Sequence, residues 1–165
     1  MDTKYAKLFE PFRIRGVELK NRIAMAPMGA LGLLEPDGSL GERAKDYYLE
    51  RARGGVGLII TSVFKVENDI DPLIHGIPLV TGTAGMAFAE LAEALHGLGT
   101  KIFVQLTAGF GRVATPFMLT KQPVSASALP NYWDPSVTCR ELETSEVETI
   151  VHKMGEAAEI LANAD

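Results

Sequence analysis

The sequence predicts an α/β protein with a parallel sheet, and three observations indicate this class. Two uninterrupted apolar runs, "LIITSV" and "KIFVQL", are typical of strands that are covered on both faces. Segments with apolar residues at helical spacing alternate with such runs along the chain. Strands that alternate with helices in this way pair in parallel through right-handed crossovers.

The N-terminal segment predicts a short hairpin that is followed at once by the first strand. In "FRIRGVELKNR", apolar residues lie on either side of Arg15 and Gly16, as in a β-hairpin. The first buried strand is predicted at residues 22–26. Pro27 must end it, because proline has no backbone donor and fixes φ. The small or flexible residues at this end, "APMG", leave room for something large and flat.

Three helices and two further strands complete the predicted order. "ERAKDYYLERARGG" predicts a helix that ends at the double glycine, and "VGLIITSV" predicts the second strand. "GMAFAELAEALHGLG" predicts the second helix, and "KIFVQL" predicts the third strand. The third helix is expected to begin with a capping box of Ser145 and Glu148 and to carry an apolar stripe from Val147 to Leu161.

Loop lengths favour a barrel over a doubly wound sheet, which is the other architecture with this pattern. The loops that follow strands are long, at about residues 65–82 and 107–142, whereas the connections that enter strands, "GGVG" and "GLGTK", are tight. Barrels build their active-site face from loops of the first kind. We therefore predict the N-terminal part of a (β/α)8 TIM barrel, with an N-terminal β-hairpin cap and about three strand–helix units.

The chain is too short for a whole barrel of this kind. A complete barrel takes about 250 residues, whereas this chain has 165. We expect residues 1–165 to be the N-terminal portion of one barrel domain, truncated before its fourth strand. The chain is then either a fragment of a larger enzyme or associates with a second chain, because three strands alone leave unpaired edges.

Composition excludes several classes of protein. Apolar residues make up 47% of the chain and charged residues 22%, as in globular domains. The net charge of -5 and the scattered basic residues argue against nucleic-acid binding. A single cysteine, Cys139, excludes a disulfide framework and a multi-cysteine metal site. Without a signal-like or membrane-spanning segment in the sequence, we expect a cytoplasmic protein with no membrane partner.

The three strand ends carry the candidate site. In a barrel they meet at one mouth, where Pro27, Met28 and Gly29 share a pocket floor with residues 61–63 and Gln105. Gln105 offers an acceptor and two donors in one plane, which suits the edge of a heterocycle with alternating C=O and N–H groups. The alternative is that Gln105 is a strand-end amide satisfied by the backbone, while Pro27 and Gly29 only shape a loop.

The long loops hold further candidates. Arg112 in "GFGRV" either faces an electron-rich ring or a phosphate, or forms a loop salt bridge. Tyr132 and Trp133 form either a lid over a ligand or ordinary loop packing. His75 lies in a loop that follows a strand, whereas Cys139 has no histidine near it in the sequence and is expected to be a passive thiol. No glycine pattern matches a dinucleotide-binding loop or a P-loop.

Four segments carry a family resemblance: "LFEPFRIRGVELKNRIAMAPMGA", "YYLERARGGVGLIITSV", "GTKIFVQLTAGFGR" and "SASAL". They resemble the old yellow enzyme family of NADH:flavin oxidoreductases, in particular its 2-enoate reductase and 2,4-dienoyl-CoA reductase branch. The resemblance spans essentially the whole chain. It implies an FMN-dependent TIM barrel that reduces activated C=C bonds of enoates, enones or dienoyl thioesters with NADH or NADPH.

The resemblance also implies flavin contacts, residue by residue. Ala26, Pro27 and Met28 match the strand-end segment that lies under the flavin in that family. Val63 stands where the family usually has alanine or glycine near the flavin. Gln105 matches the glutamine that hydrogen-bonds the pyrimidine edge of the flavin.

Two further positions correspond to the family less closely. Gly29 stands at a variable position that sometimes holds a redox-tuning cysteine or threonine. Arg112 matches the arginine of a family "GR" step, although the preceding loop is one residue longer here. The residues that anchor the substrate and the tyrosine proton donor match positions past Asp165, so no catalytic residue is assigned.

The partners that the resemblance implies are a small-molecule alkene and a nicotinamide nucleotide, and we expect a homo-oligomer. In a longer parent chain, the branch adds an iron–sulfur cluster and FAD. The 165-residue chain alone is expected to be inactive, because the proton donor is absent from it. Two alternatives stay open: a non-catalytic half-barrel that self-associates as a binding module, and a different barrel enzyme that takes an unrelated phosphate ligand.

Overall fold

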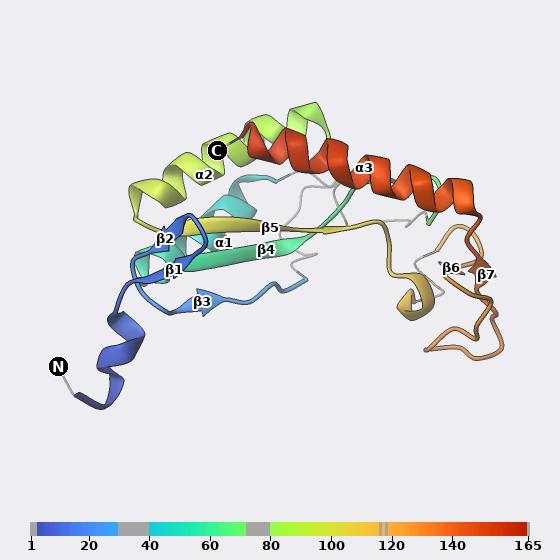
Figure 1. The fold of residues 1–165 in the computed structure, drawn as a ribbon, viewed down its shortest axis with the longest axis horizontal. Helices are drawn as coiled ribbons and strands as arrows, with labels where there is room; N and C mark the ends of the chain where they lie inside the picture. The colour runs from blue at the N-terminus through green and yellow to red at the C-terminus, as the bar shows by residue number, and fades with distance from the viewer. Residues whose placement is uncertain (1–2, 30–39, 72–79, 116, 118, 165) are drawn as a thin grey trace.

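The structure of the protein is a computed structural model, which describes residues 3–29, 40–71, 80–115, 117 and 119–164. Its centre is a parallel sheet of three strands in the order β3-β4-β5 (Figure 1). The strands are β3 (Ala24–Met25), β4 (Leu58–Lys65) and β5 (Lys101–Thr107). The helices that alternate with them are α1 (Glu42–Arg53), α2 (Gly82–Gly97) and α3 (Thr144–Ala162). The predicted class and order of elements are confirmed.

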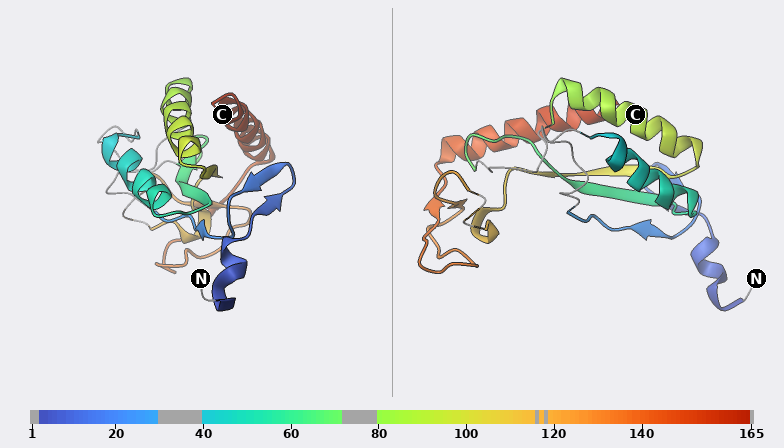
Figure 2. Two further views of the ribbon diagram at one scale, coloured as in Figure 1. Left: turned by 90° about the vertical axis from the view of Figure 1, so that its left-hand side faces the viewer. Right: turned by 180° about the vertical axis from the view of Figure 1, so that it is seen from behind.

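The helices lie around one side of the sheet. Seen along the strands, α1, α2 and α3 form an outer layer, and within the described residues no α-helix covers the opposite side (Figure 2). A parallel sheet with helices on its outside is half of the cross-section of a β/α barrel. We call the side that faces the helices the outer face, and the opposite side the inner face.

The N-terminal segment closes the end of the sheet where its strands begin. A 3-10 helix, η1 (Thr3–Phe9), precedes the antiparallel hairpin of β1 (Phe12–Ile14) and β2 (Val17–Leu19), which confirms the predicted cap. Arg15 has φ of 48°, the left-handed conformation that the tight turn requires. Lys20 then donates through Nζ to the Leu98 carbonyl at 2.7 Å, which fastens the hairpin to the turn before β5.

The strand β4 is the only one of the three that is covered on both faces. Six of its eight residues are buried, as its apolar run predicts. In β5 every residue is at least partly exposed, and in β3 one residue is exposed and the other half-buried, so the expectation of burial is wrong for these two strands. The reason is that β3 and β5 form the two edges of the described sheet, and the inner face beside them has no covering layer.

The predicted strand boundaries also need correction. β3 has only the two residues Ala24 and Met25 instead of residues 22–26, because its ladder with β4 pairs only Ala24 with Leu58 and Met25 with Ile59. β4 runs two residues past the predicted end, as far as Lys65, because the pairing with β5 continues there.

A β-bulge interrupts the pairing of β4 with β5. The register shifts between Ile60 and Val63, so that Thr61 and Ser62 together oppose a single residue of β5. Both are buried, and their polar groups are satisfied. The Ser62 amide donates to the Tyr48 hydroxyl at 2.8 Å, and the Thr61 hydroxyl donates to the Ser62 carbonyl at 2.8 Å. Beyond the bulge, Val63 pairs with Gln105.

Two apolar clusters fill the space between the sheet and the helices. The first joins α1, β4 and α2, and its buried members are Tyr48, Ala52, Ile59, Leu91 and Leu95. The second joins the end of β4 to α2 and α3, and its buried members are Phe64, Val66, Val80, Phe88 and Ala157. The helix α1 buries the face that its spacing predicts. In α2 the prediction holds for Leu91 and Leu95 but is wrong for Met86, Ala94 and Leu98, which are exposed, because the buried face is turned toward Phe88 and Ala92. The start of α2 lies three residues before the predicted one, where the Thr81 hydroxyl accepts from the Ala84 amide at 3.3 Å.

The segment after β5 has more structure than the predicted loop. It contains the short 3-10 helix η3 (Gly111–Val113) and a parallel pair of strands, β6 (Val124–Ser125) and β7 (Arg140–Glu141). Figures 1 and 2 place it beyond the carboxyl end of β5, turned toward the inner side of the sheet. We call residues 108–142 the excursion.

The predicted capping box of α3 is wrong in register. The helix begins at Thr144, and the box is formed by Glu143 and Glu146 instead of Ser145 and Glu148. The Glu146 carboxylate accepts three hydrogen bonds, one from the Glu143 amide at 2.8 Å and two from the Arg140 guanidinium at 2.7 and 2.8 Å. The arginine therefore selects the register, because the carboxylate at Glu146 satisfies both the helix start and β7.

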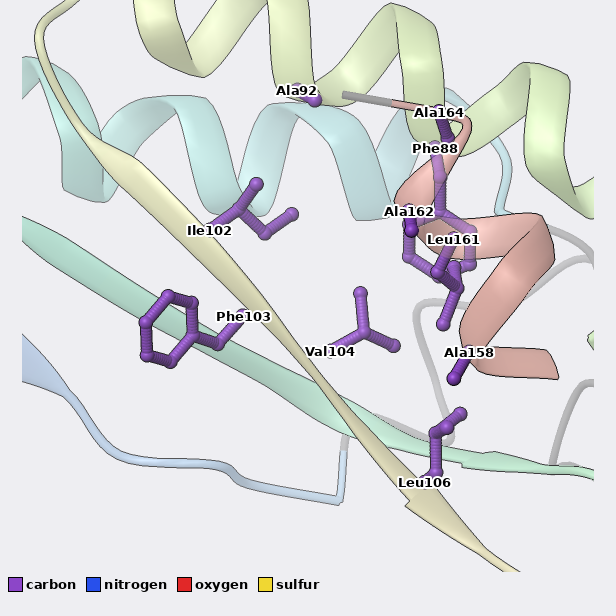
Figure 3. A pocket seen from close by; sticks show the side chains of 10 residues that line it. All are labelled: Phe88, Ala92, Ile102, Phe103, Val104, Leu106, Ala158, Leu161, Ala162 and Ala164. Atoms are coloured by element: carbon purple, nitrogen blue, oxygen red, sulfur yellow. The ribbon is translucent and has the colours of Figure 1, made fainter. Parts of the chain in front are cut away.

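The outer face of β5 lines an apolar groove beneath α2 and α3. Ile102, Val104 and Leu106 point toward the two helices, whereas Phe103 points to the other side (Figure 3). The groove has a volume of about 560 Å³ and is otherwise lined by apolar residues of the helices. The alternation fixes the orientation of β5, so Gln105 lies on the inner face with Phe103.

Removal of the Tyr48 hydroxyl is expected to destabilise the protein. Tyr48 is 2% exposed, and its oxygen is the acceptor of the bulge amide at Ser62. Y48F should lower the free energy of unfolding by about 1–3 kcal/mol, because it takes a buried acceptor from a buried donor. Y47F is the matched control, since the Tyr47 hydroxyl makes no hydrogen bond with the described residues and its ring packs on Arg51. Equal urea midpoints for Y48F and Y47F would contradict this role.

Acid is expected to weaken the junction between β7 and α3. Hydrogen bonds from Arg140 and from the Glu143 amide lower the pKa of Glu146 from 4.5 to about 2. Because the folded-state pKa is the lower one, this stabilisation is complete above pH 4.5 and is lost as the pH falls through about 2. The urea midpoints of the wild type and E146Q should therefore converge over that range. E141Q, at an exposed carboxylate of β7, is the control, and a constant gap between wild type and E146Q would refute the assignment.

Candidate functional site

The carboxyl ends of β3, β4 and β5 form one edge of the sheet, which we call the mouth. The parallel order β3-β4-β5 brings the segment after β3 to this edge beside the end of β4, as predicted. Val63 and Gln105 are paired neighbours on adjacent strands, and both lie on the inner face. The structure thus brings the predicted strand-end residues to the same edge of the same sheet.

The segment after β3 is open to its surroundings. Ala26, Pro27, Met28 and Gly29 are all exposed, and 62% of Met28 is accessible. A side chain added at Gly29 would meet no atom of the described residues within 4 Å. Among the described residues, nothing covers this end of the first strand.

Gln105 presents a free carboxamide at the mouth. Its backbone amide donates to the Thr61 hydroxyl at 3.3 Å, so the bulge fixes the strand at this residue. The side chain is exposed and makes no hydrogen bond with the residues that the structure describes. The interpretation of Gln105 as an amide satisfied by the backbone is therefore not supported within the described ranges, and its donors and acceptor are available to a ligand.

Arg112 lies in η3, just past the mouth. Its Nε donates to the Pro130 carbonyl at 2.9 Å, and the residue is exposed. Among the described residues no carboxylate lies within ion-pair distance of it, so the predicted alternative of a loop salt bridge is not found there. One edge of the guanidinium is used for anchoring, and the terminal nitrogens remain for another partner.

A buried asparagine organises the excursion around Arg112. The Asn131 side chain is 1% exposed and donates to the carbonyls of Arg112 and Ala114 at 3.0 and 2.7 Å. Its oxygen accepts from the amides of Trp133 and Asp134 at 2.9 and 3.0 Å. Sequence analysis missed this residue, because "NYWDP" showed a turn-forming asparagine but not the distant segment that it holds.

The aromatic pair beside Asn131 is exposed. Tyr132 and Trp133 are 58% and 61% exposed, with their rings edge to face at 4.9 Å. The Trp133 Nε1 donates to the Val113 carbonyl at 2.8 Å, which ties the indole to η3. Of the two interpretations of this pair, ordinary packing beneath the loop does not fit, because large apolar surfaces stay accessible.

A buried charged cluster at the end of β4 was also missed. Lys65, Glu67 and Asp71 are 1%, 6% and 3% exposed. Lys65 Nζ donates to the Asp71 carbonyl oxygen. Burial lowers the pKa of Lys65, although the charges of Asp71 and Glu67 act in the opposite direction. Lys65 escaped notice because the strand was predicted to end at Val63; a lysine two residues after an apolar run was the available signal.

The other candidates have structural environments. Cys139 is fully buried, in agreement with a passive thiol, and His152 pairs with Glu156 at 3.0 Å on α3. His75 lies outside the described residues. Within the described ranges, no group of three or more histidine, cysteine, aspartate or glutamate side chains is placed to hold a metal ion. Each helix described there is too short or too polar to cross a membrane.

The chain belongs to the NADH:flavin oxidoreductase / NADH oxidase family, whose profile matches residues 7–165. It is 42% identical to a cinnamate reductase of Clostridium sporogenes, over 99% of this chain and 25% of that protein. It is 40% identical to an NADH oxidase of Thermoanaerobacter brockii, over 94% of this chain and 24% of that protein. The chain thus spans about a quarter of the length of these relatives.

Solved structures of the same family have a similar fold. The old yellow enzyme homologue of Zymomonas mobilis matches with a TM-score of 0.79 and 28% identity, over 96% of this chain and 46% of that one. The chain therefore has the fold of the N-terminal part of a TIM barrel of the old yellow enzyme family, with three strand–helix units and the hairpin cap.

Loss of the Asn131 amide is expected to release the excursion without unfolding the sheet. N131A removes four hydrogen bonds of a buried side chain, so the ring of Trp133, the chain's single tryptophan, should lose its fixed surroundings. We expect a red shift of its emission and a loss of near-ultraviolet circular dichroism, with the far-ultraviolet spectrum retained. N163A, at an exposed asparagine that ends α3, should change none of these signals. An unchanged Trp133 emission in N131A would disprove the anchoring role.

Proposed function

We propose that the mouth of this chain is half of an FMN site, in a protein that uses NADH or NADPH to reduce activated C=C bonds. The observation that carries the proposal is the alignment of Gln105 with Val63 on the inner face, beside the exposed segment after β3. The family resemblance supports the same assignment, since Ala26, Pro27 and Met28 match its flavin-contacting segment. When bound, FMN supplies the hydride chemistry.

The mouth fits a flavin in its shape and in its donor set. Open space at Gly29 and the small side chain of Ala26 admit a flat ring. The exposed Gln105 carboxamide has two donors and an acceptor, which match a pyrimidine edge of C=O and N–H groups. Val63 presents an apolar surface next to it on the neighbouring strand.

Each proposed residue has a distinct role. Gln105 orients the ring, and its donors favour electron density on the pyrimidine edge. Arg112, anchored through Nε, places positive charge near the mouth and so favours an anionic ring or phosphate. Gly29 leaves space where a side chain would face the ring, and Pro27 and Met28 form the floor.

For the substrate, we propose α,β-unsaturated acyl compounds: enoates, enones or dienoyl thioesters. The support is the likeness to a relative named cinnamate reductase, which covers 99% of this chain. Within the described residues we assign no catalytic group that touches the alkene. We propose that residues 1–165 form one portion of a barrel domain whose proton donor lies elsewhere in the whole protein, and that this protein is a cytoplasmic homo-oligomer. An iron–sulfur cluster and FAD belong to the same proposal for a longer chain.

A rival function has its own support in the open strand edges and the apolar groove. The exposed edges β3 and β5 and the groove beneath α2 and α3 would suit a half-barrel that pairs with a second copy. Size-exclusion chromatography and the visible spectrum separate the two cases. A yellow chain with stoichiometric flavin supports the FMN site, and a colourless oligomer supports the rival. Ene-reductase turnover by the 165 residues alone would refute our expectation that they are inactive.

Replacement of Gln105 is expected to weaken FMN binding. Q105L removes the hydrogen bonds to the pyrimidine edge, so the dissociation constant for FMN, measured by quenching of flavin fluorescence, should rise about tenfold or more. The chain's other glutamine provides the control: Gln122 donates to the Thr138 carbonyl in the excursion, and Q122L should change the constant less than twofold. Equal dissociation constants for Q105L and wild type would refute the role of Gln105.

A further inference from the structure

Asp71 connects the loop after β4 to the loop after β5. One oxygen of its carboxylate, Oδ2, accepts from the backbone amides of Phe110 and Gly111 at 3.0 and 3.2 Å. The two loops are 39 and 40 residues apart at these contacts, so the carboxylate joins segments that the chain itself does not hold together. Hydrogen bonds from amides to a buried carboxylate are among the strong ones in proteins.

The turn at residues 109–111 is built around this carboxylate. A Cβ added to Gly109 would lie 2.1 Å from the Asp71 Oδ2, so only glycine allows the approach. Gly111 has φ of 54°, a left-handed conformation that also favours glycine. The Thr107 hydroxyl closes the turn, because it accepts from the Gly109 amide at 3.1 Å and donates to the Gly109 carbonyl at 2.6 Å.

Lys65 holds Asp71 from the other side. Its Nζ donates to the Asp71 carbonyl, and the side chain is buried at the last residue of β4. The sheet thus reaches the turn through two successive contacts, from Lys65 to Asp71 and from Asp71 to the amides. The second carboxylate oxygen, Oδ1, is buried and has no partner among the described residues.

The residue directly after this turn is Arg112. We call the contacts of Asp71 with Lys65 and with the amides of Phe110 and Gly111 the clamp.

The backbone carbonyl and Nε of Arg112 are fixed by Asn131 and Pro130, so the arginine is held between the clamp and the rest of the excursion. We propose that Asp71, supported by Lys65, is a positioning residue that sets where Arg112 presents its charge at the mouth. The link to flavin binding rests on the proposed function, whereas the clamp itself does not.

The clamp can be tested on the chain without any ligand. In a ¹⁵N-labelled chain, D71A should speed hydrogen exchange of the Phe110 and Gly111 amides about tenfold or more and should shift the Nε–H resonance of Arg112. D71N, which keeps one acceptor oxygen, should give smaller changes of the same kind and serves if D71A does not fold. D69A, at an exposed carboxylate of the same loop, should leave all three signals within twofold of wild type.

The outcomes separate positioning from mere support. If D71N or D71A perturbs the two amides and the Arg112 Nε–H together, the proposal stands. If the amides respond but the Arg112 resonance does not move, Asp71 supports only the turn, and the proposal is overturned. Unchanged amides in either variant would also overturn it.

A second measurement links the clamp to the flavin. R112A should raise the dissociation constant for FMN at least fivefold in the wild-type background and by a smaller factor in D71N, because the arginine is already partly displaced there. Equal effects in both backgrounds would contradict positioning by Asp71. A chain that binds no FMN would refute the proposed function alone, since the exchange experiment still decides the clamp.

Discussion

The pairing of β4 with β5 across the bulge at Thr61 and Ser62 is the constraint on which the mouth depends. It shifts the register so that Val63 and Gln105 become neighbours on the inner face. The Tyr48 hydroxyl and the Thr61 hydroxyl satisfy the groups that the bulge leaves out of the ladder. Because strand alternation has a period of two, a slip by one residue would turn Gln105 toward the helices and away from the mouth.

The mouth is extended by loops that polar contacts hold in place. Asp71 joins the loops after β4 and β5, and Asn131 joins two segments of the excursion, near Arg112 and near Trp133. Both side chains are buried, and each satisfies backbone groups that a loop otherwise exposes to water. Arg112 lies between these two contacts. The rigid part of the site therefore comes from the sheet, and its charged part comes from loops that are fastened to it.

The class, the order of elements and the strand-end residues could be predicted from the sequence, because each rests on local pattern. The apolar run "LIITSV" and the helical spacing of apolar residues in α1 and α2 both reflect burial between the sheet and the helices. Burial of β3 and β5 could not be read in the same way, since it depends on a covering layer for the inner face. The cap of α3 was misplaced because Arg140, outside the helix, binds Glu146, so that Glu143 instead of Ser145 becomes the N-cap. Asp71 and Asn131 were missed because their partners are distant in sequence, and Lys65 because the strand was predicted to end before it.

The central claim is that a flavin occupies the mouth, and chemical-shift mapping during an FMN titration tests it most directly. The account predicts that the largest shifts fall on residues 26–29, Val63, Gln105 and Arg112, on the inner face of three adjacent strand ends. Shifts that gather instead in the groove beneath α2 and α3, at Ile102 and Val104, would contradict it, as would a titration that moves no resonance at all.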